Sequence, residues 1–147
     1  VFEAGGYHII SRLLDGDFLD YKSAIPANNA THVRVNTKLF INSIERTSLL
    51  ITDRLKSPVR CVFDENTIRI SSITSLGSAN DKIDAASEGN RVEIGFNNRF
   101  MLEALKVVDT DEVRIELNGA VSPILILPPD GDSFLFLVLP VRLKNEN

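Results

Sequence analysis

The strongest constraint on the fold is an internal repeat. Residues 32–45, HVRVNTKLFINSIE, align without a gap with residues 93–106, EIGFNNRFMLEALK. In each copy an alternating apolar run leads to an asparagine, Asn36 or Asn97, and then to apolar residues at helical spacing. An asparagine at this place can accept a hydrogen bond from the first turn of a helix. Each copy therefore predicts a strand, an asparagine cap and an amphipathic helix.

The segments that follow the two predicted helices also agree. The first helix is followed by VRCVF and TIRISS, joined by a polar turn at residues 64–66, and by a weaker strand at residues 82–86. The second is followed by EVRIEL, the hairpin signal Asn118-Gly119, AVSPILIL and FLFLVLP. The sequence thus predicts a βαβββ plan twice, in an α+β fold with both helices on one side of antiparallel sheets.

The N-terminal segment lies outside the repeat. One strand is expected at Tyr7 to Leu14, ended by the turn signal Asp15-Gly16. Pro26 and small polar residues then predict a linker, with a domain boundary near residues 23–28. Because the chain begins with Val1, we expect it to be a fragment of a longer protein.

The residue types argue against an enzyme. The chain has no Gly-rich phosphate loop after a strand, no cysteine–histidine metal spacing and no histidine near a nucleophile, since its histidines are His8 and His32. Cys61 shares one strand face with Val59 and Phe63 and is expected in the core, and one unpaired thiol fits a cytoplasmic location. The net charge of −4 argues against a generally basic nucleic-acid binder. We expect no catalytic residue, metal or cofactor.

Two features of the predicted helices suggest contacts with a partner. Leu49, Leu50 and Ile51 cannot all face one core from a helix, so either some of them meet a partner or the helix ends there and buries all three. The helices also carry four cations, each pair of which shares roughly one helical face. These cations suit sequence-independent phosphate contact, or they form a solvated face. They are Lys38 and Arg46 on the first helix, and Arg99 and Lys106 on the second.

The third feature is the apolar C-terminal segment. Leu137, Val138 and Leu139 cannot all hide on one face of a half-exposed sheet. Pro140 has no N–H and is expected to end the strand pairing, which leaves the residues after it to wall a surface groove. Such a groove could bind short apolar peptides, whereas burial of a last strand in the core is the alternative.

Three segments resemble a known family. RLLDGDFLDYKSAIP, GFNNRFMLEAL and FLVLPVRL are similar to the bacterial sliding clamp, the β subunit of the DNA polymerase III holoenzyme, in this order and along essentially the whole chain. The resemblance implies that residues 1–25 are the last strand of the middle clamp domain plus a linker, and that residues 26–147 are the third domain. It implies a non-enzymatic processivity factor: a homodimeric ring around duplex DNA, with helices lining the hole.

The resemblance also assigns roles to residues. Partners would be the polymerase III α subunit, the clamp loader and repair proteins, bound through short apolar motifs. Phe100 stands where many clamps have tyrosine, and Pro123 where others have serine. Leu50 and Ile51 would meet the other subunit, and Lys38, Arg46, Arg99 and Lys106 would face DNA. The peptide-binding residues would be Leu19, Ala24, Asn97, Phe100, Val121, Pro123, Leu137, Val138, Leu139, Pro140, Val141, Arg142 and Leu143.

A competing hypothesis is a clamp-fold domain that binds peptides or assembles without a DNA role. Replacing the four helix cations in a full-length ring would weaken DNA loading if the protein is a DNA-encircling clamp, but not if the domain has no DNA role. A chain that lacks most of the middle domain is expected to bind clamp motifs weakly and not to slide on DNA.

Overall fold

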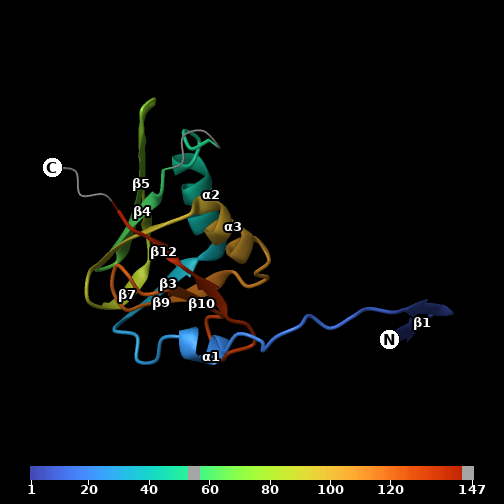
Figure 1. Ribbon diagram of the computed structural model, residues 1–147. Helices are drawn as coiled ribbons and strands as arrows, with labels where there is room; N and C mark the ends of the chain where they lie inside the picture. Colours follow the sequence, from blue (N-terminus) through green and yellow to red (C-terminus); the bar gives the residue numbers. More distant parts are fainter. Residues whose placement is uncertain (53–56, 144–147) are drawn as a thin grey trace.

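The computed structural model describes residues 1–52 and 57–143 of the chain. Apart from an N-terminal hairpin, its strands form two five-stranded antiparallel sheets, ordered β11-β10-β9-β3-β7 and β12-β8-β4-β5-β6 (Figure 1). The elements are β1 Phe2–Ala4, β2 Tyr7–Ile9, α1 Tyr21–Ala24, β3 Thr31–Asn36, α2 Thr37–Thr47, β4 Val59–Asp64, β5 Thr67–Thr74, β6 Gly77–Asp84, β7 Ala86–Gly89, β8 Val92–Phe96, α3 Asn98–Lys106, β9 Glu112–Leu117, β10 Ile124–Leu127, β11 Phe136–Val138 and β12 Pro140–Val141.

The two asparagine caps are confirmed. The backbone N–H of Leu39 donates to Asn36 Oδ1 at 3.0 Å, and that of Arg99 donates to Asn97 Oδ1 at 2.9 Å. Each bond satisfies one of the donors that a helix N-terminus leaves free. The same local signal therefore ends the strand and starts the helix in both copies of the repeat.

The two repeat units exchange strands. β3 belongs to the first unit but pairs with β9 of the second, and β8 belongs to the second unit but pairs with β4 of the first. Each sheet is thus built from both units, which relates them by an approximate twofold symmetry. Neither unit can complete a sheet without the other.

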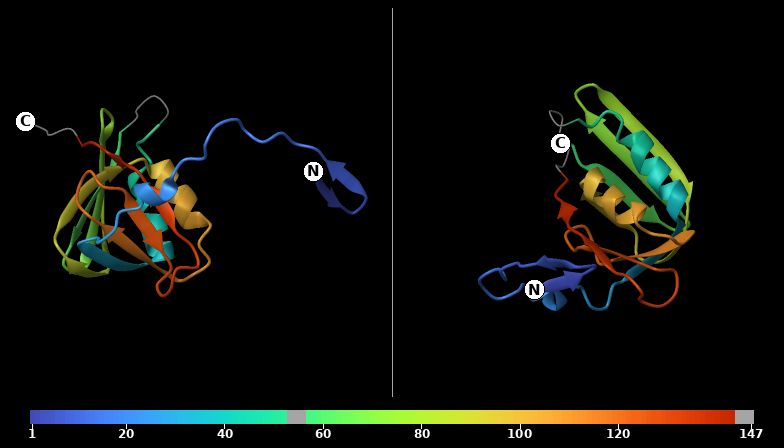
Figure 2. Two further views of the ribbon diagram at one scale, coloured as in Figure 1. Left: turned by 60° about the horizontal axis from the view of Figure 1, so that its bottom comes forward. Right: turned by 90° about the vertical axis from the view of Figure 1, so that its right-hand side faces the viewer.

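Both helices pack against the same side of the sheets, where one core forms (Figure 2). Phe40 and Ile44 of α2 and Met101 and Leu105 of α3 are fully buried in it. Full burial of a large apolar side chain contributes about 1.5–3 kcal/mol. The predicted arrangement of two helices on one side of antiparallel sheets is therefore confirmed.

The last strand of each unit was predicted as one piece and is in fact divided. In place of the weak strand at residues 82–86, β6 and β7 are separated by Ala85 and lie in different sheets. In the second unit, β11 and β12 are separated by Leu139 and also lie in different sheets. Pro140 does not end the pairing: it opens β12, opposite Phe96, at the sheet edge where a missing N–H is tolerated.

Two other strand predictions were wrong in their bounds. AVSPILIL becomes a strand only from Ile124, because the loop continues through Pro123. The predicted strand from Tyr7 to Leu14 ends at Ile9, and Leu13 and Leu14 are 94% and 96% exposed. Nothing in the described chain covers these apolar side chains: the segment before α1 extends away from the rest of the molecule (Figure 1). The short helix α1 stands where the sequence predicted only a linker.

Candidate functional site

The C-terminal segment crosses from one sheet to the other, and this crossing exposes part of it. Leu137 pairs with Leu125 in the first sheet, and Val141 pairs with Gly95 in the second. Between them Leu139 is 67% exposed, and Val141 is 38% exposed. Val138, by contrast, is buried in the core. Of the two interpretations of this segment, core burial accounts for Val138 and surface exposure for Leu139 and Val141.

Gly95 allows this segment to lie close to β8. A Cβ atom at Gly95 would stand 2.6 Å from the Leu143 side chain and 2.6 Å from the backbone oxygen of Val141. Distances this short are not tolerated, so any side chain at this position would displace the segment. The sequence signal for this close contact is that the repeat aligns Gly95 with the large residue Arg34, although no role was predicted for Gly95.

A cavity of about 730 Å³ lies beside β12 at the start of α3. It brings together two of the predicted peptide-binding residues, Asn97 and Val141. The cavity also reaches the loop after α2, whose contribution the sequence did not predict. Its described lining is Ile51, Thr52, Ser57, Pro58, Asn97, Asn98, Arg99 and Val141.

The remaining predicted peptide-binding residues are dispersed around this segment. Phe100, on the first turn of α3, is 56% exposed, and Val121, in the loop before β10, is 78% exposed. Pro123 is half-buried at the end of the same loop, and Leu19 and Ala24 lie in the exposed segment that leads to β3. Pro140 and Leu143 are half-buried, whereas Arg142 is exposed.

The predicted DNA-facing cations are mostly paired with carboxylates. Arg99 Nε lies 2.9 Å from Glu103 Oε1, and Lys106 Nζ lies 2.5 Å from Glu45 Oε1, a bridge between the two helices. Lys38 is exposed and has no ion pair among the described residues. The predicted cations therefore share their surface with acids. The Arg99–Glu103 pair was readable as an i,i+4 spacing, whereas Lys106–Glu45 depends on the packing of the helices.

Arg46 points to the edge of the second sheet, where it forms an ion pair with Asp81 of β6. Burial raises the pKa of Asp81, but the neighbouring Ser43 hydroxyl and the Arg46 guanidinium lower it by more. The net result is a pKa below the ordinary value for an aspartate. Arg46 thus fastens α2 to β6.

The apolar run after α2 divides between core and surface. Leu49 is 79% exposed, whereas Ile51 packs against the core and Leu50 is half-buried beside Gly77. Gly77 begins β6, which is the free edge of the second sheet in the described chain. Leu76, in the turn before β6, is 70% exposed. An exposed apolar group thus adjoins an unpaired strand edge.

The core position predicted for Cys61 is confirmed. Its side chain is fully buried, and burial raises the pKa of the thiol far above its ordinary value. A thiol that stays protonated is a poor nucleophile and a poor metal ligand. In residues 1–52 and 57–143 no helix is long and apolar enough to cross a membrane.

Proteins of known family match this chain over most of its length. Residues 22–142 match the family model for the DNA polymerase III beta subunit, C-terminal domain. The beta sliding clamp of Staphylococcus epidermidis is 32% identical over 144 residues, which is 97% of this chain and 38% of the relative. That of Staphylococcus aureus is 31% identical over the same shares. The chain thus spans 38% of the length of these relatives.

Solved structures are similar over most of the chain. The DNA polymerase sliding clamp from Bacillus subtilis has a TM-score of 0.86 and 38% identity, covering 91% of this chain and 36% of its own. A sliding clamp from Bartonella birtlesii bound to griselimycin has a TM-score of 0.82 and 30% identity, covering 88% and 35%.

Proposed function

The chain belongs to the family defined by the C-terminal domain of the DNA polymerase III beta subunit, and we propose that it forms the C-terminal part of a sliding clamp. The complete protein would be a ring that encircles duplex DNA and tethers the replicative polymerase and other partners. It acts as a replication processivity factor without enzymatic chemistry. The observation that carries this proposal is the family match across residues 22–142.

In this proposal residues 26–147 are the third domain of the clamp, and residues 1–25 are the last strand of the middle domain with its linker. The exposure of the whole N-terminal segment supports this division, since the apolar side chains of Ile10, Leu13 and Leu14 lack the domain that would cover them. The unpaired Cys61 thiol and a DNA partner support a cytoplasmic location.

A contact between two copies of the clamp is proposed at the free edge of β6. An unpaired edge strand exposes backbone groups that another chain can satisfy. Exposed apolar residues next to it, Leu49 and Leu76, would be buried by the same contact. Leu50, one of the two residues predicted from the resemblance, is half-buried with its side chain close to Gly77, while Ile51 would act by holding this segment on the core.

Peptide binding is proposed at the C-terminal segment. Leu139, Val141 and Phe100 are exposed apolar side chains near a cavity that Asn97 helps to line. Apolar side chains with a few polar groups are typical of peptide pockets. Griselimycin bound to a related clamp supports a ligand-binding role for this family. The occupants would be short apolar motifs of the polymerase III α subunit, the clamp loader and repair proteins.

The test is a titration of this chain with a fluorescent peptide that ends in a Gln-Leu-x-Leu-Phe type motif, followed by fluorescence anisotropy. We expect weak binding that Leu139→Asp abolishes. Leu76→Asp is the matched control, because it places the same charge at another exposed leucine and should leave binding unchanged. Equal binding by both variants, or loss of binding in the control alone, would place the peptide elsewhere.

A clamp-fold peptide-binding or assembly domain with no DNA role is the second candidate. The pairing of Arg46, Arg99 and Lys106 with carboxylates favours it, because phosphates would have to compete with those acids. Replacing the four helix cations in the full-length protein distinguishes the two candidate functions. Loss of DNA loading with intact peptide binding supports the ring, and unchanged DNA loading supports the domain with no DNA role.

A further inference from the structure

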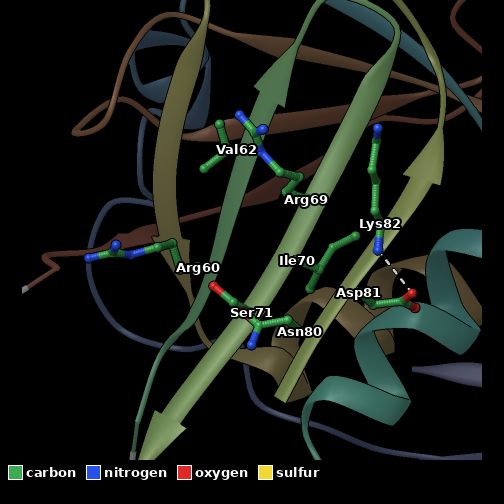
Figure 3. Close-up of a pocket in the computed structure, with 8 residues that line it drawn as sticks. All are labelled: Arg60, Val62, Arg69, Ile70, Ser71, Asn80, Asp81 and Lys82. Atoms are coloured by element: carbon green, nitrogen blue, oxygen red, sulfur yellow. Dashed lines mark hydrogen bonds between the residues drawn. The ribbon is translucent and has the colours of Figure 1, made fainter. Parts of the chain in front are cut away.

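The outward face of the second sheet carries a group of basic side chains that the proposed function does not use. Arg60 of β4, Arg69 of β5 and Lys82 of β6 line an open cavity of about 620 Å³ (Figure 3). Arg69 stands opposite Val62 on one side and Lys82 on the other. The other lining residues are Ile70, Ser71, Asn80 and Asp81. We call this surface the basic face.

The arginines of the basic face share too few carboxylates. Arg60 lies 3.4 Å from Glu93, and Arg69 lies 3.3 Å from Asp64. Arg91 contacts both of these acids, at 3.2 Å from Glu93 and 3.6 Å from Asp64. Three guanidinium groups therefore depend on two carboxylates, and the side chains of Arg60, Arg69 and Arg91 are 36%, 54% and 51% exposed.

Lys82 adds a further positive charge without a matching acid. Its ammonium has no ion pair among the described residues. Asp81 beside it lies toward a helix in Figure 3, and its carboxylate pairs with Arg46 of α2. Strand alternation places Asp84 on the same side as Lys82, so four cations face three carboxylates even with Asp84 included. In a chain with net charge −4, this face carries a local positive excess.

We propose that the basic face binds a short acidic segment of a protein partner. Adjacent strands are about 4.8 Å apart, so Arg69 and Lys82 can both reach carboxylates that lie about 7 Å apart, two residues along an extended peptide.

A protein segment fits this face better than nucleic acid does. Asp64 and Glu93 interrupt the positive charge, which disfavours a backbone with a negative charge at every nucleotide. The described lining contains no aromatic side chain on which a base could stack. An acidic peptide can place its few carboxylates beside Arg69 and Lys82 and avoid the acids.

The experiment measures anisotropy of a fluorescent peptide of alternating glutamate and leucine, with a glutamine-for-glutamate peptide as its uncharged counterpart. The variant carries Arg69→Thr and Lys82→Thr, both exposed strand positions where threonine is well tolerated. Its matched control carries Lys22→Thr and Arg34→Thr, which remove the same charge elsewhere on the chain. Circular dichroism checks that both variants are folded.

We expect the acidic peptide to bind, the uncharged peptide to bind more weakly, and the face variant to lose about tenfold in affinity. The control variant should stay near the parent, and the Gln-Leu-x-Leu-Phe peptide should bind the face variant as it binds the parent. Equal losses in both variants, or no binding of the acidic peptide, would overturn the proposal. Displacement of the peptide by single-stranded oligothymidine, lost in the face variant, would assign the surface to nucleic acid and overturn it too.

Discussion

The two repeat units share one plan but end differently. In the first unit the last strand divides into β6, of 8 residues, and β7, of 4. In the second it divides into β11, of 3 residues, and β12, of 2. The long polar β6 leaves a free edge suited to another chain, whereas the short apolar end of the second unit exposes Leu139 and Val141 beside a cavity. Duplication thus supplies two divided terminal strands, and sequence divergence gives each of them a different surface.

The difference is clearest at one pair of aligned positions. Arg34 in β3 pairs with Ala86 of β7, and Gly95 in β8 pairs with Val141 of β12. Arg34 extends from its sheet and reaches Asp130 and the carbonyl of Pro129. Gly95 has no side chain, so that Leu143 and the β12 backbone can lie against it. The first unit tolerates a large side chain where the second requires none.

The largest expected effect comes from removing this difference. Gly95→Ala places a methyl group within 2.6 Å of backbone and side-chain atoms of the terminal segment. We expect a loss of about 1–3 kcal/mol in the free energy of unfolding, measured by urea denaturation, together with a loss of motif-peptide binding. Arg34→Ala, at the aligned position, should cost less and leave peptide binding intact. If Gly95→Ala binds the peptide like the parent, the terminal segment is not held as described.

A smaller effect, on DNA affinity, should distinguish the cations of the two helices. Lys38 and Arg99 occupy matching positions, but Lys38 has no ion pair among the described residues, whereas Arg99 pairs with Glu103. In the full-length protein Lys38→Ala should lower DNA affinity more than Arg99→Ala, and it should reduce the slope of log K against log salt by about 0.9. Fluorescence anisotropy with labelled duplex at several salt concentrations measures both. Equal losses would mean that the acids near α3 do not compete with phosphate.

The smallest effect concerns the attachment of α2 to β6. The pKa of Asp81 is lower in the folded chain than its ordinary value, so its contribution to stability is present above that ordinary value, near 3.8, and is lost as pH falls below it. Because the pair is partly exposed, Asp81→Asn should cost less than about 1 kcal/mol at neutral pH. Urea denaturation at pH 7 and near pH 3 should show a difference between parent and variant that shrinks at the lower pH. A constant difference would assign the effect to packing.

Local patterns predicted much of this fold. The repeat, the two asparagine caps and the turn at residues 64–66 depend on neighbouring residues, and the resemblance to bacterial sliding clamps is confirmed by the family match. The divisions at Ala85 and Leu139 could not be predicted in this way, because the residues after each division pair with the first strand of the same unit, about 50 residues earlier in the chain, and not with the strand before them. The full length of β6 was missed for a different reason: GSANDKID has little apolar alternation, and the strand forms through its hairpin pairing with β5.

The candidate site was predictable to a similar degree. An apolar terminal segment interrupted by a proline indicated exposed residues, and Leu139 and Val141 are exposed. The burial of Val138 and the ion pair between Lys106 and Glu45 depend on the packing of elements far apart in the sequence. Such contacts leave no periodic signal in a single chain.

A protein that closes into a ring around DNA, as proposed for the clamp to which this chain would contribute, should be retained on circular DNA but not on linear DNA. The full-length protein would be loaded onto nicked circular duplex, separated from free protein by gel filtration, and measured again after the DNA is cut once. We predict that the protein stays with the circle and is released from the linear duplex, because a ring slides off a free end. Equal retention on both forms, or none on the circle by a protein that still binds the motif peptide, would contradict the account.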